Sequence, residues 1–121
     1  MTNINQRFRS LSVWSEGVAM ARAIYRLTAE FPPDEKFGLT SQLRRAAVSV
    51  PSNIAEGSVR RSRRDFCRFV EIALGSLAEI ETQLEIADDM ARNPVTRSDV
   101  EVRVARVRKM LYRLYRVLDQ A

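Results

Sequence analysis

The sequence contains no histidine and only one cysteine, Cys67. These absences exclude serine-histidine and cysteine-histidine catalytic pairs, histidine-based metal sites and any disulfide within the chain. No run approaches the roughly 18 apolar residues of a membrane-spanning helix. The polar residues 1–10 also lack the apolar stretch of a secretory signal. We therefore expect a cytoplasmic protein with no metal, no cofactor and no membrane partner.

Helix-breaking residues are scarce as well, with four glycines and four prolines among 121 residues. Alanine, leucine, valine, arginine and glutamate dominate the composition, which is typical of packed helices. The length suits one domain with a single core. Residues 1–10 show no apolar period and are expected to be mobile. The folded domain is therefore predicted to span residues 11–121.

Apolar residues recur at spacings of three and four, the period of an α-helix, in four segments of the chain. These segments are 12–31, 42–57, 62–91 and 100–118. Their connections are short, which favours antiparallel neighbours. The sequence thus predicts an all-α protein, a single-domain antiparallel up-down-up-down four-helix bundle.

Capping residues and prolines set the expected ends of these helices. Pro32 and Pro94 end the first and third helices, because the residue before a proline avoids the helical conformation. The candidate N-terminal caps are Ser12 for the first helix, residues 38–41 for the second, Ser62 with Asp65 for the third, and Thr96 with Asp99 or Ser98 with Glu101 for the fourth.

Two positions break the rules for helix interiors. The segment QLRRAAVSVPSNIAEG, residues 42–57, places Pro51 where the ring removes a backbone donor and crowds the carbonyl of Ala47. A kink or a tightened turn is expected there. In the third helix, Gly75 costs about 1 kcal/mol relative to alanine. We interpret it as a site of close approach by another helix.

Polar side chains on the second and third helices are predicted to form a buried hydrogen-bonded network that fixes helix register. One of two adjacent arginines is expected to pair with one of two glutamates in it. The set is Arg44, Arg45, Ser49, Asn53, Glu56, Ser76 and Glu79. Glu56 and Glu79 could be imagined as catalytic carboxylates, but bundle di-metal sites use Glu-x-x-His and the chain has no histidine. We expect no catalytic residues and no enzyme.

The net charge is +5, and 18 arginines against two lysines supply it. Such a balance is typical of proteins with an anionic partner such as RNA, although the base composition of a genome explains an arginine bias equally well. The charge distribution has to decide between these explanations.

Two groups of arginines are candidates for phosphate binding, because guanidinium groups match phosphate oxygens. The first lies in and after the connection 58–64, and the second lies beyond the reach of the acidic stretch 71–89. The members are Arg60, Arg61, Arg63, Arg64 and Arg68, and then Arg113 and Arg116. The alternative is a solvated loop that keeps the protein soluble. Since the loop contains no aromatic residue, base stacking on it is not expected.

The remaining charges of the last helix are expected to pair with the acidic stretch of the third helix, and each exposed pair contributes only about 0 to 1 kcal/mol. Both helices also carry more apolar surface than one bundle core needs, which predicts a homo-oligomer. The apolar residues off the main stripes are Phe69, Ile72, Leu74, Ile86, Met110, Tyr112, Tyr115 and Val117.

The combination of FP, GL, QLRRAA, S-x-P-x-N-I-A-E-G and A-x-G-S-x-x-E over residues 11–90 resembles bacterial four-helix-bundle proteins encoded within intervening sequences of 23S ribosomal RNA genes. The resemblance implies a homo-oligomer, a ring-like pentamer, and transfers no catalytic residue. Similar bundles are accessory proteins of diversity-generating retroelements, where they engage a reverse transcriptase and nucleic acid. The positions that match the family signature are Arg44, Arg45, Pro51, Asn53, Glu56, Gly57, Gly75, Ser76 and Glu79.

Two hypotheses of function follow from the sequence. The first is a non-catalytic oligomer that binds nucleic acid, RNA or DNA, through the arginine groups. The second is an oligomeric scaffold that recruits another protein, such as a reverse transcriptase. An enzyme is a third possibility that no motif in the sequence supports.

Overall fold

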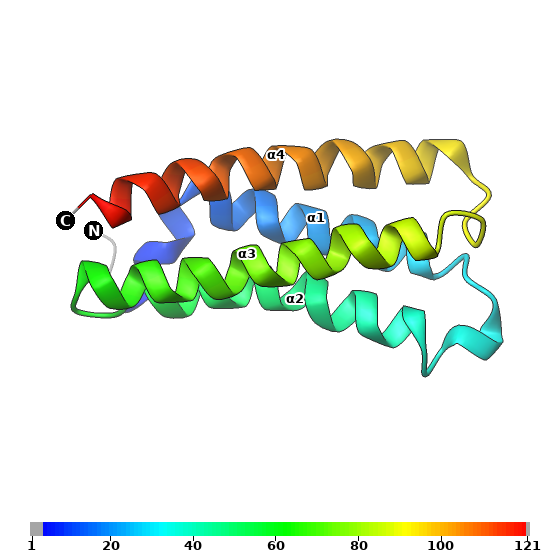
Figure 1. The fold of residues 1–121 in the computed structure, drawn as a ribbon, viewed down its shortest axis with the longest axis horizontal. Helices are drawn as coiled ribbons and strands as arrows, with labels where there is room; N and C mark the ends of the chain where they lie inside the picture. Colours follow the sequence, from blue (N-terminus) through cyan, green and yellow to red (C-terminus); the bar gives the residue numbers. More distant parts are fainter. Residues whose placement is uncertain (1–3, 121) are drawn as a thin grey trace.

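The computed structural model describes the backbone of residues 4–120 and the side chains of residues 7–120. The described chain forms four α-helices and two short 3-10 helices, and it contains no strand. They are η1 (Ile4–Ser10), α1 (Ser12–Thr28), η2 (Pro33–Glu35), α2 (Leu39–Ser58), α3 (Arg63–Ile86) and α4 (Pro94–Asp119). Successive α-helices run in opposite directions (Figure 1). The predicted all-α bundle is confirmed.

Each α-helix packs on two others around one core. α1 contacts α2 and α4, and α3 contacts the same two helices, so α1 and α3 occupy diagonal positions. The residues that fill the centre come from the predicted stripes, and burying each side chain of this size contributes about 1.5 to 3 kcal/mol. The largest fully buried ones include Met20, Ile24, Leu43, Ile54, Leu77, Ile80 and Leu111.

The predicted N-terminal cap is wrong for α1, whereas the N-cap of α2, Gly38, lies within the predicted stretch 38–41. Ser12 is the first residue of α1, and the N-cap position belongs to Leu11, which makes no side-chain capping bond. At the start of α2, the carboxylate of Glu35 accepts a hydrogen bond from the backbone N–H of Leu39 at 3.2 Å. This carboxylate comes from η2 and satisfies one of the free N–H groups of the first turn. The helix therefore needs no cap from residues 40 or 41.

Helix α3 starts as predicted and ends earlier than predicted. The Ser62 hydroxyl accepts a hydrogen bond from the N–H of Asp65 at 3.0 Å, which confirms the cap. The helix ends at Ile86, although the apolar stripe continues to residue 91. Ala87 and Ala91 are buried within the following turn. The apolar stripe therefore indicates which residues are buried, and at this end the buried residues extend beyond the helix.

Helix α4 starts before either of the predicted capping boxes. Asn93 is its N-cap, and its side-chain oxygen accepts hydrogen bonds from the N–H groups of Val95 at 2.9 Å and Thr96 at 3.4 Å. Pro94 is the first helical residue. Proline suits this position because its missing N–H would have no partner inside the helix. The same proline that was expected only to end the third helix therefore begins the fourth.

Helix α2 runs through Pro51 without interruption. Pro51 is buried against α1, where a Cβ added to Gly17 would lie only 3.3 Å from the proline Cβ. Gly17 therefore gives the proline ring its space. In Figure 1, the first half of α2 diverges from α3, whereas the half after Pro51 follows α3 closely. This course agrees with the expected bend at the proline.

Gly75 does not have the role predicted for it within the chain. It is exposed in the middle of α3, and a Cβ added to it would meet no atom within 4 Å. The predicted close approach of a neighbouring helix of the same bundle is therefore wrong. Cys67, by contrast, is buried as a small hydrophobic residue.

The N-terminal segment packs on α1 and α2 through η1. The Nε of Arg7 donates a hydrogen bond to the carbonyl of Ser58 at 2.6 Å, which ties η1 to the end of α2. Residues 1–3 of the segment lie outside the described chain, and its mobility stays a prediction. Across the described helices, none is both long enough and apolar enough to cross a membrane.

Candidate nucleic-acid interface

The turn between α2 and α3 depends on a close approach at Gly57. A Cβ added there would lie 2.6 Å from the Cβ of Phe69 and 2.9 Å from the Cδ1 of Phe66. Any other residue would therefore push the start of α3 away from the end of α2. The contact fixes the direction in which the basic residues of the turn leave the bundle.

Arg60 is held on two sides at this turn. Its guanidinium pairs with the carboxylate of Glu56 at 2.9 Å, and its central carbon lies 4.9 Å from the centre of the Phe69 ring. A cation above an aromatic ring gains about 0.5 to 1 kcal/mol at an exposed site. Phe69 comes from the second turn of α3, so an inspection of the loop sequence alone missed it.

The other arginines of the first predicted group are exposed around the same turn. Arg61 lies in the turn, Arg63 and Arg64 are the first two residues of α3, and Arg68 follows one turn later. A helix N-terminus carries partial positive charge, so cations in its first turn cost about 0.3 to 1 kcal/mol each. Two arginines therefore stand where the helix itself disfavours them.

The structure adds two arginines that the sequence reasoning missed. Arg7 and Arg9 reach this end of the molecule through η1, and Arg9 lies 5.4 Å from the Phe8 ring and 5.7 Å from the Trp14 ring. The two rings contact each other edge to face at 5.1 Å. The signal was present as alternating basic and aromatic residues in RFR, within the segment expected to be mobile.

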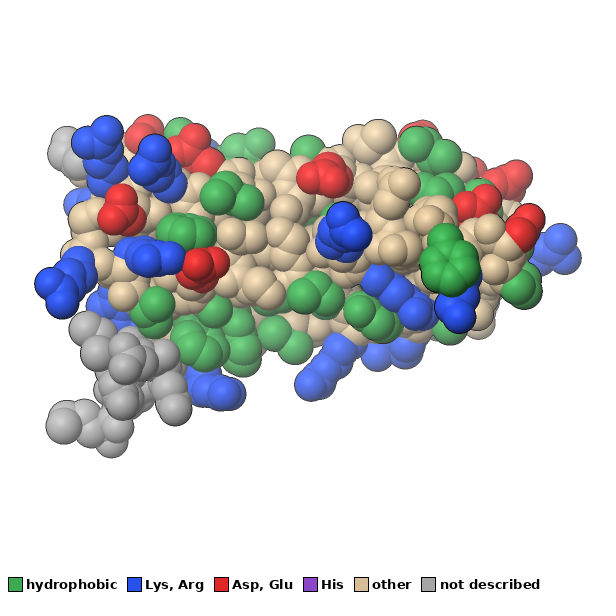
Figure 2. All heavy atoms as spheres, turned by 90° about the horizontal axis from the view of Figure 1, so that it is seen from below, with side chains coloured by type: hydrophobic (Ala, Val, Ile, Leu, Met, Phe, Trp, Pro, Cys, Tyr) green, Lys and Arg blue, Asp and Glu red, His purple; other side chains and the backbone are tan. Residues whose placement is uncertain are grey.

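The second predicted group lies at the same end. The C-terminal end of α4, with Arg113 and Arg116 exposed on it, lies beside the α2–α3 turn (Figure 1). Figure 2 shows basic side chains gathered at this left-hand end of the molecule. We call this region the basic end, and it consists of Arg7, Arg9, Arg60, Arg61, Arg63, Arg64, Arg68, Arg113 and Arg116.

A few acids lie within the basic end. Asp119, followed by Glu71, raises the pKa of Tyr115 above its ordinary value. Burial, with smaller contributions from the same two acids, raises the pKa of the Cys67 thiol. Cys67 therefore stays protonated at neutral pH and is a poor nucleophile.

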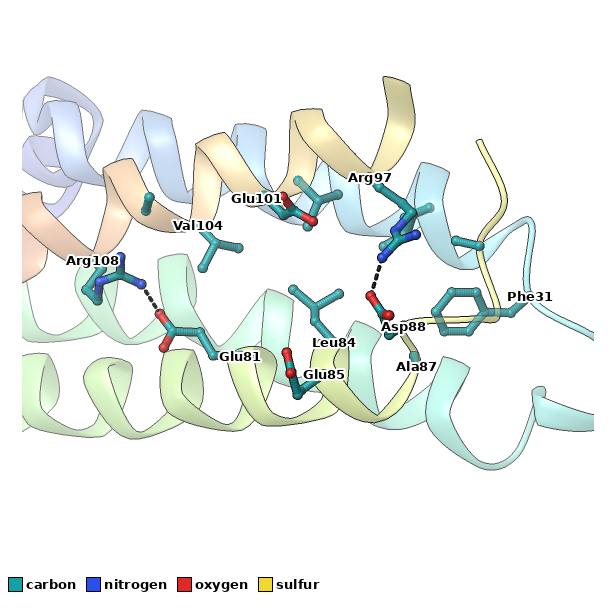
Figure 3. A pocket seen from close by; sticks show the side chains of 14 residues that line it. Phe31, Glu81, Leu84, Glu85, Ala87, Asp88, Arg97, Glu101, Val104 and Arg108 are labelled. Carbon is teal, nitrogen blue, oxygen red and sulfur yellow. Dashed lines mark hydrogen bonds and ion pairs between the residues drawn. The ribbon is translucent and has the colours of Figure 1, made fainter. Parts of the chain in front are cut away.

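Arginines elsewhere on α4 are paired, but only some of them pair with the acidic stretch 71–89 that the sequence predicted as their partner. Arg108 pairs with Glu81 across the cleft between α3 and α4, and Arg97 pairs with Asp88 at the end of the same cleft (Figure 3). Pairs of this kind also link α4 to α1 and join residues within α4. They are Arg106 with Glu16, Arg26 with Asp99, and Arg103 with Asp99.

The predicted polar network forms only in part. The hydroxyls of Ser49 and Ser76 lie 2.8 Å apart, and the Asn53 amide donates to the Ser49 carbonyl at 2.8 Å and to its hydroxyl at 2.9 Å. This cluster joins α2 to α3. Glu56 pairs with Arg60 instead of the expected arginines, and Arg45 and Glu79 are exposed.

Arg44 makes a different contact from the one predicted. Its Nε donates to the hydroxyl of Thr28 at 2.9 Å, and its guanidinium lies 4.6 Å from the centre of the Tyr25 ring. It therefore joins α2 to α1. Sequence spacing could not reveal this contact, because it depends on how the two helices cross.

No cluster of three or more potential metal ligands occurs among the described histidine, cysteine, aspartate and glutamate residues. The fold and its charges define a small antiparallel helical bundle with a dense group of exposed arginines at one end. A family model, 23S rRNA-intervening sequence protein, matches residues 9–113, and the chain belongs to this family. No curated protein gives a significant match to the chain.

Proposed function

We propose that the protein binds nucleic acid, with RNA as the first candidate, through the basic end, and that it does so as a cytoplasmic homo-oligomer without catalysing a reaction. The observation that supports this proposal most directly is the position of Arg63 and Arg64 in the first turn of α3. A bound phosphate would accept hydrogen bonds from the free N–H groups of that turn and would neutralise both arginines. The unfavourable placement then becomes favourable.

The surroundings of this turn support phosphate binding. Arg61 and Arg68 extend the positive surface on either side of it, and both are exposed. Arg60, held by Glu56 and Phe69, is partly preorganised, which lowers the entropy lost on binding. Contacts of this kind fix the position of a nucleic-acid backbone and carry no sequence information.

Oligomerisation would multiply the basic end. The residues predicted to lie at an interface divide into two groups. Ile72, Ile86, Tyr112 and Val117 are exposed, whereas Leu74, Met110 and Tyr115 pack partly against the core and Phe69 is half-buried beside Arg60. The family resemblance implies a ring-like pentamer. Several basic ends on one particle would neutralise many phosphates of one RNA at once and raise its apparent affinity.

The test is a titration of structured RNA and of duplex DNA with the protein over a series of salt concentrations. The variant replaces Arg61, Arg63 and Arg64 with glutamine and keeps the held Arg60. We expect its binding to be weaker, with a slope of log affinity against log salt reduced by about two per bundle, since each phosphate contact contributes about 0.7 to 0.9.

The matched control removes three positive charges elsewhere by replacing Lys36, Arg45 and Arg92, all exposed, with glutamine. An equal loss in both variants would mean that net charge alone governs binding and would contradict a site at the basic end. Absence of RNA and DNA binding in the unaltered protein would favour the second hypothesis, a scaffold for another protein such as a reverse transcriptase.

A further inference from the structure

An apolar groove lies on the outer side of α1 and α2. It has a volume of about 680 Å³, and Trp14, Val18, Tyr25 and Val48 line it. Tyr25 and Val48 keep 43% and 44% of their surface exposed. The charged residues of its lining are Arg22 and Arg26. The groove is therefore apolar with a positive edge, and exposed apolar patches of this kind mark interaction sites.

A second surface, the outer face of α3, has the opposite charge. It consists of Ile72, Gly75, Glu79, Thr82 and Ile86, which recur at spacings of three and four and are all exposed. Ile72 and Ile86 keep 51% and 62% of their surface in solvent. From residue 71 to residue 89 the chain contains six acids and no base. Of these acids, Glu79 lies on the face, whereas Glu81 and Asp88 pair with α4 and Arg68 lies beside Ile72. The face is therefore apolar, with negative charge at Glu79 in its middle.

Figure 2 shows both surfaces in one view, with α2 and α3 toward the viewer. Green side chains with blue ones beside them follow the lower margin, and red ones lie in the upper half. Because α1 and α3 are diagonal in the bundle, the groove and the outer face of α3 belong to different sides of one copy. A single copy cannot bring them together.

We infer that the outer face of α3 of one copy docks into the groove between α1 and α2 of the next copy. Apolar surface meets apolar surface, and Glu79 of α3 meets Arg22 and Arg26. Gly75 then has the function that the isolated bundle does not give it, because a glycine lets a second helix approach closely. Its cost in the helix, about 1 kcal/mol, is offset in the assembly. This inference rests on the homo-oligomer of the proposed function.

The two surfaces differ, so the contact is heterologous. A heterologous contact leaves one groove and one α3 face unfilled on every open assembly, and only a closed ring fills them all. The basic end lies at the end of the bundle, whereas both docking surfaces lie along its sides. Each copy in the ring would keep its arginines accessible to nucleic acid.

Two variants test the contact, one on each surface. Val48→Glu places a negative charge in the groove, where the outer face of α3 with Glu79 would dock. Gly75→Arg places a long positive side chain on α3, where a Cβ meets no atom of the same copy within 4 Å. Each variant alone should weaken association on the order of thirtyfold or more, the size expected for a central interface residue. Light scattering measures the mass, and circular dichroism verifies that helix content is unchanged.

Mixing the two variants gives the sharpest result. The Gly75→Arg copy has an intact groove and the Val48→Glu copy has an intact α3 face, so an equal mixture should associate again through this one contact, whereas neither variant does so alone. The matched control is Val102→Glu, which alters an equally exposed valine on α4 and should keep the mass of the unaltered protein.

The outcomes separate this inference from the proposed function. Variants that keep the full mass, or variants that dissociate without pairing when mixed, would overturn the docking of α3 into the groove and leave the homo-oligomer standing. A monomeric unaltered protein would overturn both. RNA binding is measured in parallel, and its loss in the unaltered protein would affect only the proposal for the basic end.

Discussion

The basic end and the cleft between α3 and α4 use arginine in different ways. At the basic end, Arg63 and Arg64 are exposed in the first turn of a helix that disfavours positive charge. Along the cleft, Arg97 and Arg108 pair with carboxylates (Figure 3). The number of arginines alone therefore does not locate a binding surface. The presence or absence of acidic partners beside them is more informative.

The largest expected effect breaks the packing of the basic end. Gly57→Ala forces a Cβ to within 2.6 Å of Phe69, so we expect a loss of about 1 to 3 kcal/mol in the free energy of unfolding. Gly75→Ala is the matched change at a position that is open within one copy, so in the dissociated bundle at high dilution it should be neutral or stabilise by up to about 1 kcal/mol. Urea unfolding at one protein concentration measures both. Equal effects of the two changes would show that Gly57 makes no special contact.

Removal of the N-cap of α3 or of α4 compares the two ends of the bundle more directly. Ser62→Ala removes the cap of α3 and Asn93→Ala removes the cap of α4, and each should cost about 1 kcal/mol. Only the Ser62 change disturbs the turn that presents the arginines, so only this variant should also bind RNA more weakly. Equal RNA affinities for the two variants would show that RNA binding by the arginines does not depend on the geometry of the first turn of α3.

Single charges should change stability with opposite signs at the basic end and in the cleft between α3 and α4. Arg63→Gln removes a cation from the positive end of a helix and should raise the free energy of unfolding by about 0.3 to 1 kcal/mol at low salt. Arg108→Gln removes the partner of Glu81 and should lower it by about 0 to 1 kcal/mol. A stabilising effect that persists in high salt would argue against the electrostatic explanation.

The smallest effect concerns the acids within the basic end. Because Asp119 raises the pKa of Tyr115, the folded protein holds the phenolic proton more tightly than the unfolded chain does. The resulting stability is complete below the pKa of the unfolded chain and is lost as pH rises through the raised pKa. Asp119→Asn should lower the Tyr115 pKa, measured by tyrosinate absorbance with Tyr25 and Tyr112 replaced by phenylalanine. An unchanged Tyr115 pKa in this variant would show that the Asp119 carboxylate does not act on the Tyr115 phenol.

The sequence was sufficient for the fold because apolar spacing is a local signal that burial enforces. It located the stripes of all four helices and the Ser62 cap. It missed two helix starts that short-range side-chain bonds decide, because Glu35 binds the N–H of Leu39 and Asn93 caps α4 before either predicted capping box. Side-chain partners were harder still, because Arg44 reaches Thr28 only through the crossing of α1 and α2.

Part of the candidate site was visible in the sequence and part was not. The exposed arginines of the 58–64 connection could be named from charge alone, since few acids stand near them in the chain. Arg7 and Arg9 were missed, because their place at the same end depends on the packing of η1. Gly57 and Gly75 look alike in the sequence, and only the structure separates a crowded glycine from an open one.

The most direct test of the central claim is amide hydrogen exchange of the protein with and without a structured RNA. We expect slower exchange at the N–H groups of Arg63 and Arg64 in the first turn of α3, because bound phosphates would occupy them, whereas Asp65 and Phe66 already bond to Ser62. The turns at the opposite end, around residues 33–38 and 87–93, should be unaffected. Protection at that opposite end, with none at the start of α3, would contradict the assignment of nucleic-acid binding to the basic end.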